Sequence, residues 1–398
     1  MKILILDEEF PWPLNTGKRI RSYHLARALT ARHEVHYMAY GRSDSEGCAA
    51  MAQARLNPVA VPEPDRSKSG PRFYLRLLAN LASSLPYIVT SHRSPAFQAE
   101  VDRRARAGGY DLVLCEWSPY GIFVKDLRTP KRVLVAHNIE SHIWERYEEH
   151  ERNPLRRWYI TRQRRKVQAY ERAAFGWADG ATAVSEVEAE EIRALGPAGP
   201  VTVIENGVDT DYFAPLGGAE EPQTLVFTGS MDWRPNQDAA HWFVREIWPG
   251  LRAARPGLSA LFVGRAPSPD VVELGKTPGI TITGTVPDVR PMIERAAVYI
   301  VPLRIGGGSR LKILEALAME KAVVSTRVGA EGLIVEEGRH VVLADTPGDF
   351  AAAVLRALDD PAARRRLGSA GRALVVDHYR WQSIGARLDD FLTRVAAG

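Results

Sequence analysis

Residues 304–316 have the sequence RIGGGSRLKILEA, and these residues give the clearest indication of the fold class. This stretch follows the apolar run Val298–Val301 and leads into a helix predicted over Leu311–Met319, which is the strand–loop–helix pattern of a parallel α/β sheet. Glycines let backbone N–H groups approach a ligand closely, and the start of a helix favours negative charge. Arg310 and Lys312 add cationic donors for phosphate. We therefore expect an anion-binding loop made of Gly306, Gly307, Gly308 and Ser309. The alternative is a glycine turn whose neighbouring charges are simply solvated.

The same alternation of strands and helices continues on both sides of this stretch. Apolar runs typical of buried strands occur at Lys2–Leu6, Glu34–Ala39, Leu112–Cys115, Arg132–Ala136, Gly180–Val184, Thr202–Ile204, Thr224–Thr228, Ser259–Val263, Ile280–Thr283, Val298–Val301, Ala322–Ser325 and His340–Leu343. Helical patterns occur at Gly17–Ala31, Pro71–Leu85, Pro95–Ala107, Leu155–Phe175, Gln237–Ile247, Val289–Ala296, Leu311–Met319 and Asp349–Leu358. The turn-rich segment Glu205–Gly218 separates two such series. The pattern predicts two doubly wound α/β domains, whose ligands bind at the carboxyl ends of the strands.

Composition and motifs exclude several other classes of protein. The 398 residues include 52 basic and 48 acidic ones, a balance that argues against nucleic acid as the main partner. Two cysteines without a C-x-x-C pair exclude a cysteine-rich zinc module and suggest a cytoplasmic setting. The nucleotide and hydrolase signatures G-x-G-x-x-G, H-E-x-x-H and G-x-S-x-G are missing. Asp209 and Asp211 form either a metal-binding pair or, as we favour, a turn.

Further motifs occur in a fixed order along the chain. They are Val135–Asn138, Ile204–Asp209, Phe227–Gly229, Phe262–Gly264 and Gly329–Gly332. Together with residues 304–316 they resemble the retaining GT-B glycosyltransferases of family 4 over nearly the whole chain. The runs Asn138–Ser141 and Asn236–Asp238 resemble the branch found in bacterial exopolysaccharide and surface-glycan gene clusters. The resemblance implies an acceptor-binding domain over 1–210, a donor-binding domain over 211–378, and a helix over 379–398 that crosses back to the first domain.

The resemblance also implies an activity and roles for single residues. The enzyme would move a sugar from a nucleotide-diphosphate sugar to a glycan or polyprenyl-phosphate-linked acceptor, with retention of configuration and without a metal or other cofactor. Glu315 would hold the ribose, Arg310 and Lys312 would neutralise the diphosphate, and His137 would face the transferred sugar. Further donor-binding residues would be Gly17, Gly229, Ser230, Arg234, Asn236 and Val286, with Gly17 letting its loop close over the phosphates and Val286 near the base.

Two positions depart from the family pattern. Gly307 stands where the family has a glutamate that grips sugar hydroxyls, and Ser230 stands in place of an arginine. Neutralisation of the phosphate charge then depends more strongly on Arg310 and Lys312, with Arg304 or Arg234 as a further cation. The departures leave open a non-catalytic subunit that binds nucleotide sugars. A GT-B sugar-nucleotide epimerase is the other alternative, and a scarcity of loop carboxylates argues against it. The base, the sugar, the acceptor and the oligomeric state do not follow from the sequence.

A basic segment suggests a surface contact. Residues 152–172 hold eight basic side chains and one acidic one, Glu171, with Trp158 and Tyr159 among them. Together with the apolar residues of 73–85, this segment is expected either to contact anionic lipid or the phosphates of a lipid-linked acceptor, or to be a solvated helix face beside a core helix. The first alternative makes the protein a peripheral protein of the inner membrane face.

Overall fold

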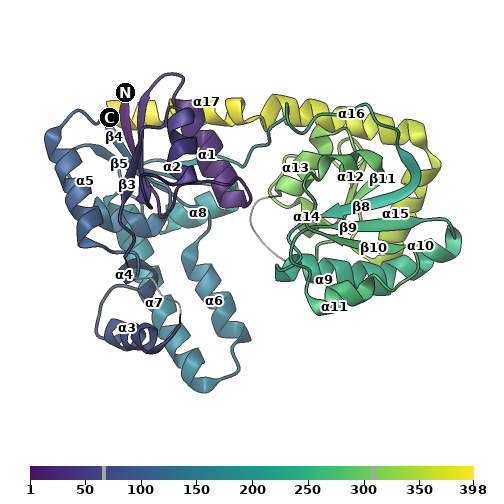
Figure 1. Ribbon diagram of the computed structural model, residues 1–398, viewed down its shortest axis with the longest axis horizontal. Helices are drawn as coiled ribbons and strands as arrows, with labels where there is room; N and C mark the ends of the chain where they lie inside the picture. Colours follow the sequence, from purple (N-terminus) through teal and green to yellow (C-terminus); the bar gives the residue numbers. More distant parts are fainter. Residues whose placement is uncertain (65–68, 306–309) are drawn as a thin grey trace. The chain divides into compact units, whose positions relative to one another are not determined.

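The computed structural model describes residues 1–64, 69–305 and 310–398. The chain forms two compact units: unit 1 comprises residues 1–205 and 384–398, and unit 2 comprises residues 206–383. Each unit contains one parallel β-sheet with helices on both faces (Figure 1). The predicted class of two doubly wound α/β domains is thereby confirmed.

Unit 1 has a seven-stranded sheet in the order β3-β2-β1-β4-β5-β6-β7. Its strands are β1 (Lys2–Leu6), β2 (Glu34–Tyr40), β3 (Pro58–Val61), β4 (Leu112–Cys115), β5 (Lys131–Val135), β6 (Gly180–Ala183) and β7 (Val201–Val203). Its helices are α1 (Gly17–Leu29), α2 (Glu46–Gln53), α3 (Pro71–Leu81), α4 (Tyr87–Thr90), α5 (Pro95–Ala107), the 3-10 helix η1 (Ser118–Phe123), α6 (Glu140–His150), α7 (Pro154–Trp177) and α8 (Glu186–Ala194).

Unit 2 has a six-stranded sheet in the order β10-β9-β8-β11-β12-β13. Its strands are β8 (Glu221–Thr228), β9 (Ser259–Val263), β10 (Ile280–Gly284), β11 (Ala296–Val301), β12 (Val323–Ser325) and β13 (Val342–Leu343). Its helices are α9 (Arg234–Trp242), the π-helix η2 (Phe243–Ile247), α10 (Trp248–Ala254), α11 (Pro269–Leu274), α12 (Arg290–Arg295), α13 (Leu311–Ala318), α14 (Arg327–Ala330), α15 (Pro347–Asp359) and α16 (Pro361–His378).

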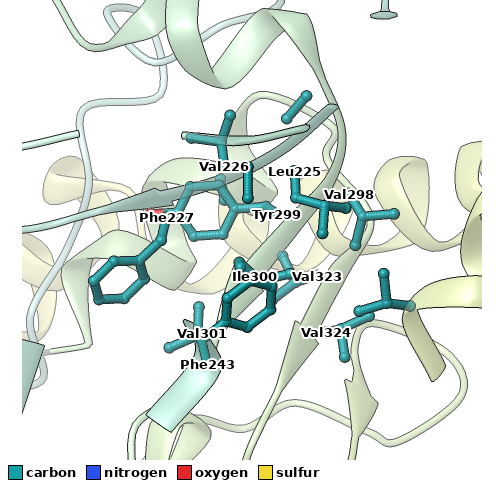
Figure 2. Close-up of a cluster of buried hydrophobic side chains, with 14 of the residues drawn as sticks. Leu225, Val226, Phe227, Phe243, Val298, Tyr299, Ile300, Val301, Val323 and Val324 are labelled. Carbon is teal, nitrogen blue, oxygen red and sulfur yellow. The ribbon is translucent and has the colours of Figure 1, made fainter. Parts of the chain in front are cut away.

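The core of unit 2 explains why its central strands are continuous apolar runs. Figure 2 shows side chains of β8, β11 and β12 packed together with Phe243 of η2. Phe227 and Tyr299 are fully buried. When helices cover both faces of a strand, its side chains are buried on both sides. The sequence of such a strand is therefore continuously apolar and does not alternate between apolar and polar residues.

The last helix is α17 (Trp381–Ala397), and its residues from Ile384 on belong to unit 1. Asp389 accepts a hydrogen bond from Arg32 at 2.8 Å and is paired with His33, whose Nδ1 lies 3.2 Å from the N-terminal ammonium group. A Cβ built on Gly180 would lie 3.0 Å from Val395 and 3.1 Å from Phe391. The chain therefore passes from unit 1 into unit 2 and returns.

Candidate functional site

The strand order of unit 2 predicts where its ligands bind. β8 lies between β9 and β11, so the loops that follow β8 and β11 leave the sheet in opposite directions. Ligands of open α/β sheets bind at this reversal, outside the carboxyl ends of the strands. Gly229 follows β8, and the segment after β11 leads to α13. Within that segment, the predicted loop of Gly306, Gly307, Gly308 and Ser309 lies outside the described residues.

Glycines at the carboxyl ends of the strands bring the main chains of neighbouring loops together. The Gly229 N–H donates to the Val263 carbonyl at 2.9 Å, and the Gly264 N–H donates to the Gly284 carbonyl at 3.2 Å. A Cβ on Gly264 would lie 1.8 Å from the Gly229 carbonyl oxygen, and one on Gly229 would lie 2.9 Å from Lys312 Nζ. Neither position has room for a side chain, so bare backbone lies beside Lys312.

Lys312 of α13 is held in a defined place. Its Nζ donates to Asn236 Oδ1 at 2.6 Å and lies 4.2 Å from the centre of the Phe227 ring. Asn236 is buried at the start of α9, and its Nδ2 donates to the Ser230 carbonyl at 2.8 Å. Burial lowers the pKa of Lys312 to about 7, although Glu315 opposes the shift. The structure thus brings together four of the predicted site residues, which are Gly229, Ser230, Asn236 and Lys312.

Glu315 lies one helical turn after Lys312 on α13. Burial raises the pKa of its carboxyl to about 7, and the charge of Lys312 opposes the shift. Its carboxylate makes no hydrogen bond to the part of the chain that the structure describes. A polar group that burial penalises and that lacks a hydrogen-bond partner is suited to a ligand with hydroxyl donors.

Arg265 was missed by the sequence analysis. It follows Gly264 at the carboxyl end of β9, and its Nε donates to Ser230 Oγ at 2.6 Å. Its carbonyl accepts from the Met231 N–H at 2.9 Å, which ties the loops after β8 and β9 together. The sequence signal that could have identified Arg265 is a basic residue directly after the glycine that follows a strand.

The other predicted cations of unit 2 are arranged differently. Arg310 immediately precedes α13, is buried, and donates to the Glu331 carboxylate at 3.0 Å. Arg304 forms two hydrogen bonds with the Asp238 carboxylate, at 2.7 and 3.1 Å. The side chain of Arg234 is exposed at the first position of α9. Val286, two residues beyond β10, packs partly buried against the core.

In unit 1, His137 lies two residues beyond β5 and beside a buried carboxylate. Its Nε2 lies 3.3 Å from Glu116 Oε2, and Glu116 accepts from Ser22 Oγ at 2.8 Å. Burial raises the pKa of Glu116, but His137, Ser22 and Arg21 outweigh it, so that the net shift is downward. Glu116 therefore remains an anion beside the imidazole, whose Nε2 makes no hydrogen bond within the described residues. Gly17 begins α1, directly after the capping residue Thr16.

A second polar cluster lies at the carboxyl edge of the unit 1 sheet. Lys18 Nζ donates to Asp7 at 2.8 Å and to Glu8 at 2.6 Å. Trp117 donates to Glu140 at 2.7 Å, and burial raises the pKa of Glu140 to about 7. The expected scarcity of loop carboxylates is therefore wrong for unit 1. The sequence signal that could have identified these carboxylates is an acidic residue just after an apolar strand. It occurs at Asp7, Glu8 and Glu116.

The acidic pair after β7 forms a turn. Asp209 Oδ1 accepts from the backbone N–H groups of Asp211 at 3.1 Å and of Tyr212 at 2.9 Å. This is the hydrogen bonding of an Asx-type turn, which the sequence analysis favoured for this pair.

Unit 1 also contains a cavity of about 580 Å³ between α6, α7 and α8. Apolar residues Ile139, Ala169 and Leu195 line it together with His142, Arg165 and Arg172. His142 lies 3.4 Å from Glu191, whereas Arg165 and Arg172 form no ion pair with any residue in the described ranges. The cavity begins two residues after His137, at the start of α6.

Two protein-family models match this chain. The model "Glycosyltransferase Family 4" matches residues 17–212, and the model "Glycosyl transferases group 1" matches residues 222–360. The chain is 28% identical to a GDP-mannose-dependent α-(1-6)-phosphatidylinositol monomannoside mannosyltransferase of Mycolicibacterium smegmatis over 226 residues, which are 50% of this chain and 58% of the relative. It is 26% identical to the lipopolysaccharide core mannosyltransferase LpcC of Rhizobium leguminosarum over 53% of this chain and 63% of LpcC. The alignments thus span little more than half of these relatives.

Solved structures share the fold over the whole chain. Sucrose-phosphate synthase from Thermosynechococcus elongatus superposes with a TM-score of 0.71 at 19% identity, covering 100% of this chain and 99% of that one. Anabaena HepE in complex with UDP and glucose superposes with a TM-score of 0.65 at 16% identity, covering 99% of both chains. Because the two family models cover most of the chain in order and the fold is confirmed, the chain belongs to the GT-B glycosyltransferases that these models describe.

Proposed function

We propose that this protein transfers a sugar from a nucleotide-diphosphate sugar to a glycan or lipid-linked acceptor, with retention of configuration, in bacterial polysaccharide biosynthesis. One observation carries the proposal: Lys312 and Glu315 lie one turn apart at the strand reversal, with Lys312 against the bare backbone of Gly229. A cation there suits a diphosphate, and a carboxylate suits ribose hydroxyls. The name of the mycobacterial relative, which specifies GDP-mannose, supports a nucleotide-sugar donor.

The proposed mechanism follows from the charge that develops as the sugar–phosphate bond breaks. Negative charge grows on the diphosphate, so a fixed cation stabilises the transition state more than the ground state. Lys312 is fixed by Asn236 and Phe227. Burial lowers its pKa in the free protein, and a bound phosphate dianion favours its protonated form. We propose that the leaving phosphate accepts the proton of the acceptor hydroxyl, so that neither a metal nor a base from the protein is required.

His137 is proposed to contact the transferred sugar. Glu116 lies beside Nε2 and favours the tautomer that carries its proton there. The other ring nitrogen, Nδ1, is then an acceptor for a sugar hydroxyl. The acceptor's charged group is proposed to bind in the cavity between α6, α7 and α8, where Arg165 and Arg172 lie among apolar residues and the polar residues Ser141, His142, Gln168 and Glu191.

Thermal unfolding with UDP, GDP, ADP and TDP, each with magnesium or with a chelator, tests the proposed function. A nucleotide at about 100 times its Kd stabilises the folded state by ~2.7 kcal/mol, a readily measured rise in Tm. We expect one nucleotide to raise Tm equally in both conditions. A rise that depends on magnesium would contradict the metal-free site, and no rise with any of the four would contradict the donor site itself. Turnover of the donor without acceptor would instead indicate an epimerase.

We also propose that unit 1 binds an anionic membrane surface. Tyr74, Leu75 and Leu78 of α3 and Leu155 and Trp158 of α7 are all more than half exposed, and we call them the α3–α7 surface. Lys166 and Arg162 of α7 donate to the carbonyls of Asn80 and Leu81, which fixes α3 against α7 (Figure 1). Exposed apolar side chains beside a basic helix suit anionic lipid. In the described parts of the chain, no helix is long and apolar enough to cross a bilayer.

Flotation with neutral and anionic vesicles tests the α3–α7 surface. The wild-type protein is expected to float with anionic vesicles and to stay in the bottom fraction with neutral ones. Trp158→Glu should abolish flotation, because it removes an apolar anchor and adds repulsion from the lipid. Val272→Glu, at an exposed apolar residue of unit 2, is the matched control and should float as the wild type does. Equal and negligible recovery with both kinds of vesicle would refute the proposal.

A further inference from the structure

A continuous chain of hydrogen bonds crosses the carboxyl edge of the unit 2 sheet. Lys312 Nζ donates to Asn236 Oδ1 at 2.6 Å, Asn236 Nδ2 donates to the Ser230 carbonyl at 2.8 Å, and Arg265 Nε donates to Ser230 Oγ at 2.6 Å. Its four residues come from four different segments: Lys312 from α13, Asn236 from α9, Ser230 from the loop after β8 and Arg265 from the loop after β9. Each end of this series of hydrogen bonds is therefore a cationic side chain.

Arg265 differs from the other arginines near this edge in what its guanidinium contacts. Arg304 forms two hydrogen bonds with Asp238, and Arg310 is paired with Glu331. Arg265 has the Ser230 hydroxyl as its hydrogen-bond acceptor, and its Nη2 forms only a long ion pair with Asp232 at 4.0 Å, beyond hydrogen-bond range. About half of its side chain is exposed. Its two Nη groups make no hydrogen bond to the residues that the structure describes.

We infer that Arg265 is a phosphate-binding residue that, with Lys312, holds the diphosphate of a nucleotide. The inference rests on the proposed function. A guanidinium is planar and offers paired N–H groups that match two phosphate oxygens, a geometry that an ammonium group lacks. Because the Ser230 oxygen accepts from Arg265, its own hydroxyl proton remains available to the same phosphate. Gly229 presents only backbone beside Lys312, since a Cβ there would lie 2.9 Å from Lys312 Nζ.

Because the side chains of Arg265 and Ser230 are in contact, the inference can be tested by moving the positive charge from one position to the other. Since the guanidinium rests on the Ser230 side chain, an arginine placed at position 230 reaches the same region from the neighbouring loop. Phosphate binding requires a positive charge in that region, whichever residue of the chain carries it. Moving the cation by the double variant S230R/R265A should therefore restore what R265A removes.

Titration calorimetry with the nucleoside diphosphate that raises the wild-type Tm is the experiment. R265A is expected to weaken binding about tenfold, the effect of losing one hydrogen bond to a charged group, and S230R/R265A to recover most of that loss. R245A, at an exposed arginine of η2, is the control and should bind as the wild type does. Should R265A unfold at a lower temperature, R265Q replaces it, because its amide can still donate to Ser230.

The outcomes separate this inference from the proposed function. If the wild type binds a nucleoside diphosphate and R265A binds it within twofold, Arg265 does not contact the phosphates and the inference is overturned. A loss in R265A that the relocated arginine does not reduce at all also overturns it, since charge would then not be what was lost. If the wild type binds none of the four diphosphates, the proposed function itself fails.

Discussion

Replacing Lys312 with methionine is expected to lower kcat about 100-fold, the usual cost of removing one preorganised group that stabilises developing negative charge. The effect on donor Kd should be smaller, because charge on the leaving diphosphate is greatest in the transition state. Methionine keeps the contact of the side chain with the Phe227 ring, so packing is largely conserved. Release of nucleoside diphosphate, followed with a lipid extract as acceptor, measures kcat.

Lys276→Met is the matched control for this variant. Lys276 is an exposed lysine of unit 2 that is paired only with Glu273 among the described residues, and its loss should leave kcat unchanged. A Lys312→Met variant with a much weaker Kd and an unaltered kcat would show that Lys312 binds the ground state and does not act on the leaving group.

Glu315→Ala is expected to weaken nucleotide binding by about 1–3 kcal/mol, because hydroxyls that lose a buried acceptor are left unsatisfied. This corresponds to a factor of about 5 to 150 in Kd. The sharpest measurement compares the preferred diphosphate with its 2′-deoxy form by calorimetry. The wild type should prefer the ribonucleotide, and the variant should bind both alike.

The exposed Glu273→Ala of the same unit serves as the control for Glu315→Ala and should keep the preference. A Glu315→Ala variant that still distinguishes ribose from deoxyribose would place the ribose contact elsewhere.

The fold was predictable where an apolar strand is largely buried on both faces. Lys2–Leu6, Leu112–Cys115 and Ser259–Val263 were predicted with the bounds that the structure shows. α16 was missed because the face that meets α13 is partly glycine: a Cβ on Gly371 would lie 2.5 Å from Leu317, so close packing replaces an apolar stripe. β3 is a short edge strand that begins with proline, and α6 is dominated by charged residues. Neither gives a periodic signal.

The part of the candidate site that could be predicted is the part formed by residues close together in the sequence. Lys312 and Glu315 lie on the helix that follows a central strand, and helical spacing places them one turn apart. A local sequence pattern does not show which distant residues pair with one another. Arg304 was therefore a candidate for binding phosphate, although its side chain is paired with Asp238. Arg265 was overlooked for the same reason, since its link to Ser230 joins loops 35 residues apart.

The return of α17 to unit 1 also has a consequence for how the chain folds during synthesis. Unit 2 is one uninterrupted segment, and all of it leaves the ribosome before residues 384–398 do. Unit 1 begins first yet lacks Phe391 and Val395 over Gly180, and Asp389 beside His33, until unit 2 has been made. Domains generally fold as units as they emerge. The first unit translated is thus the last to be completed, and a nascent chain arrested within unit 2 leaves the surface around Gly180 uncovered and open to chaperones.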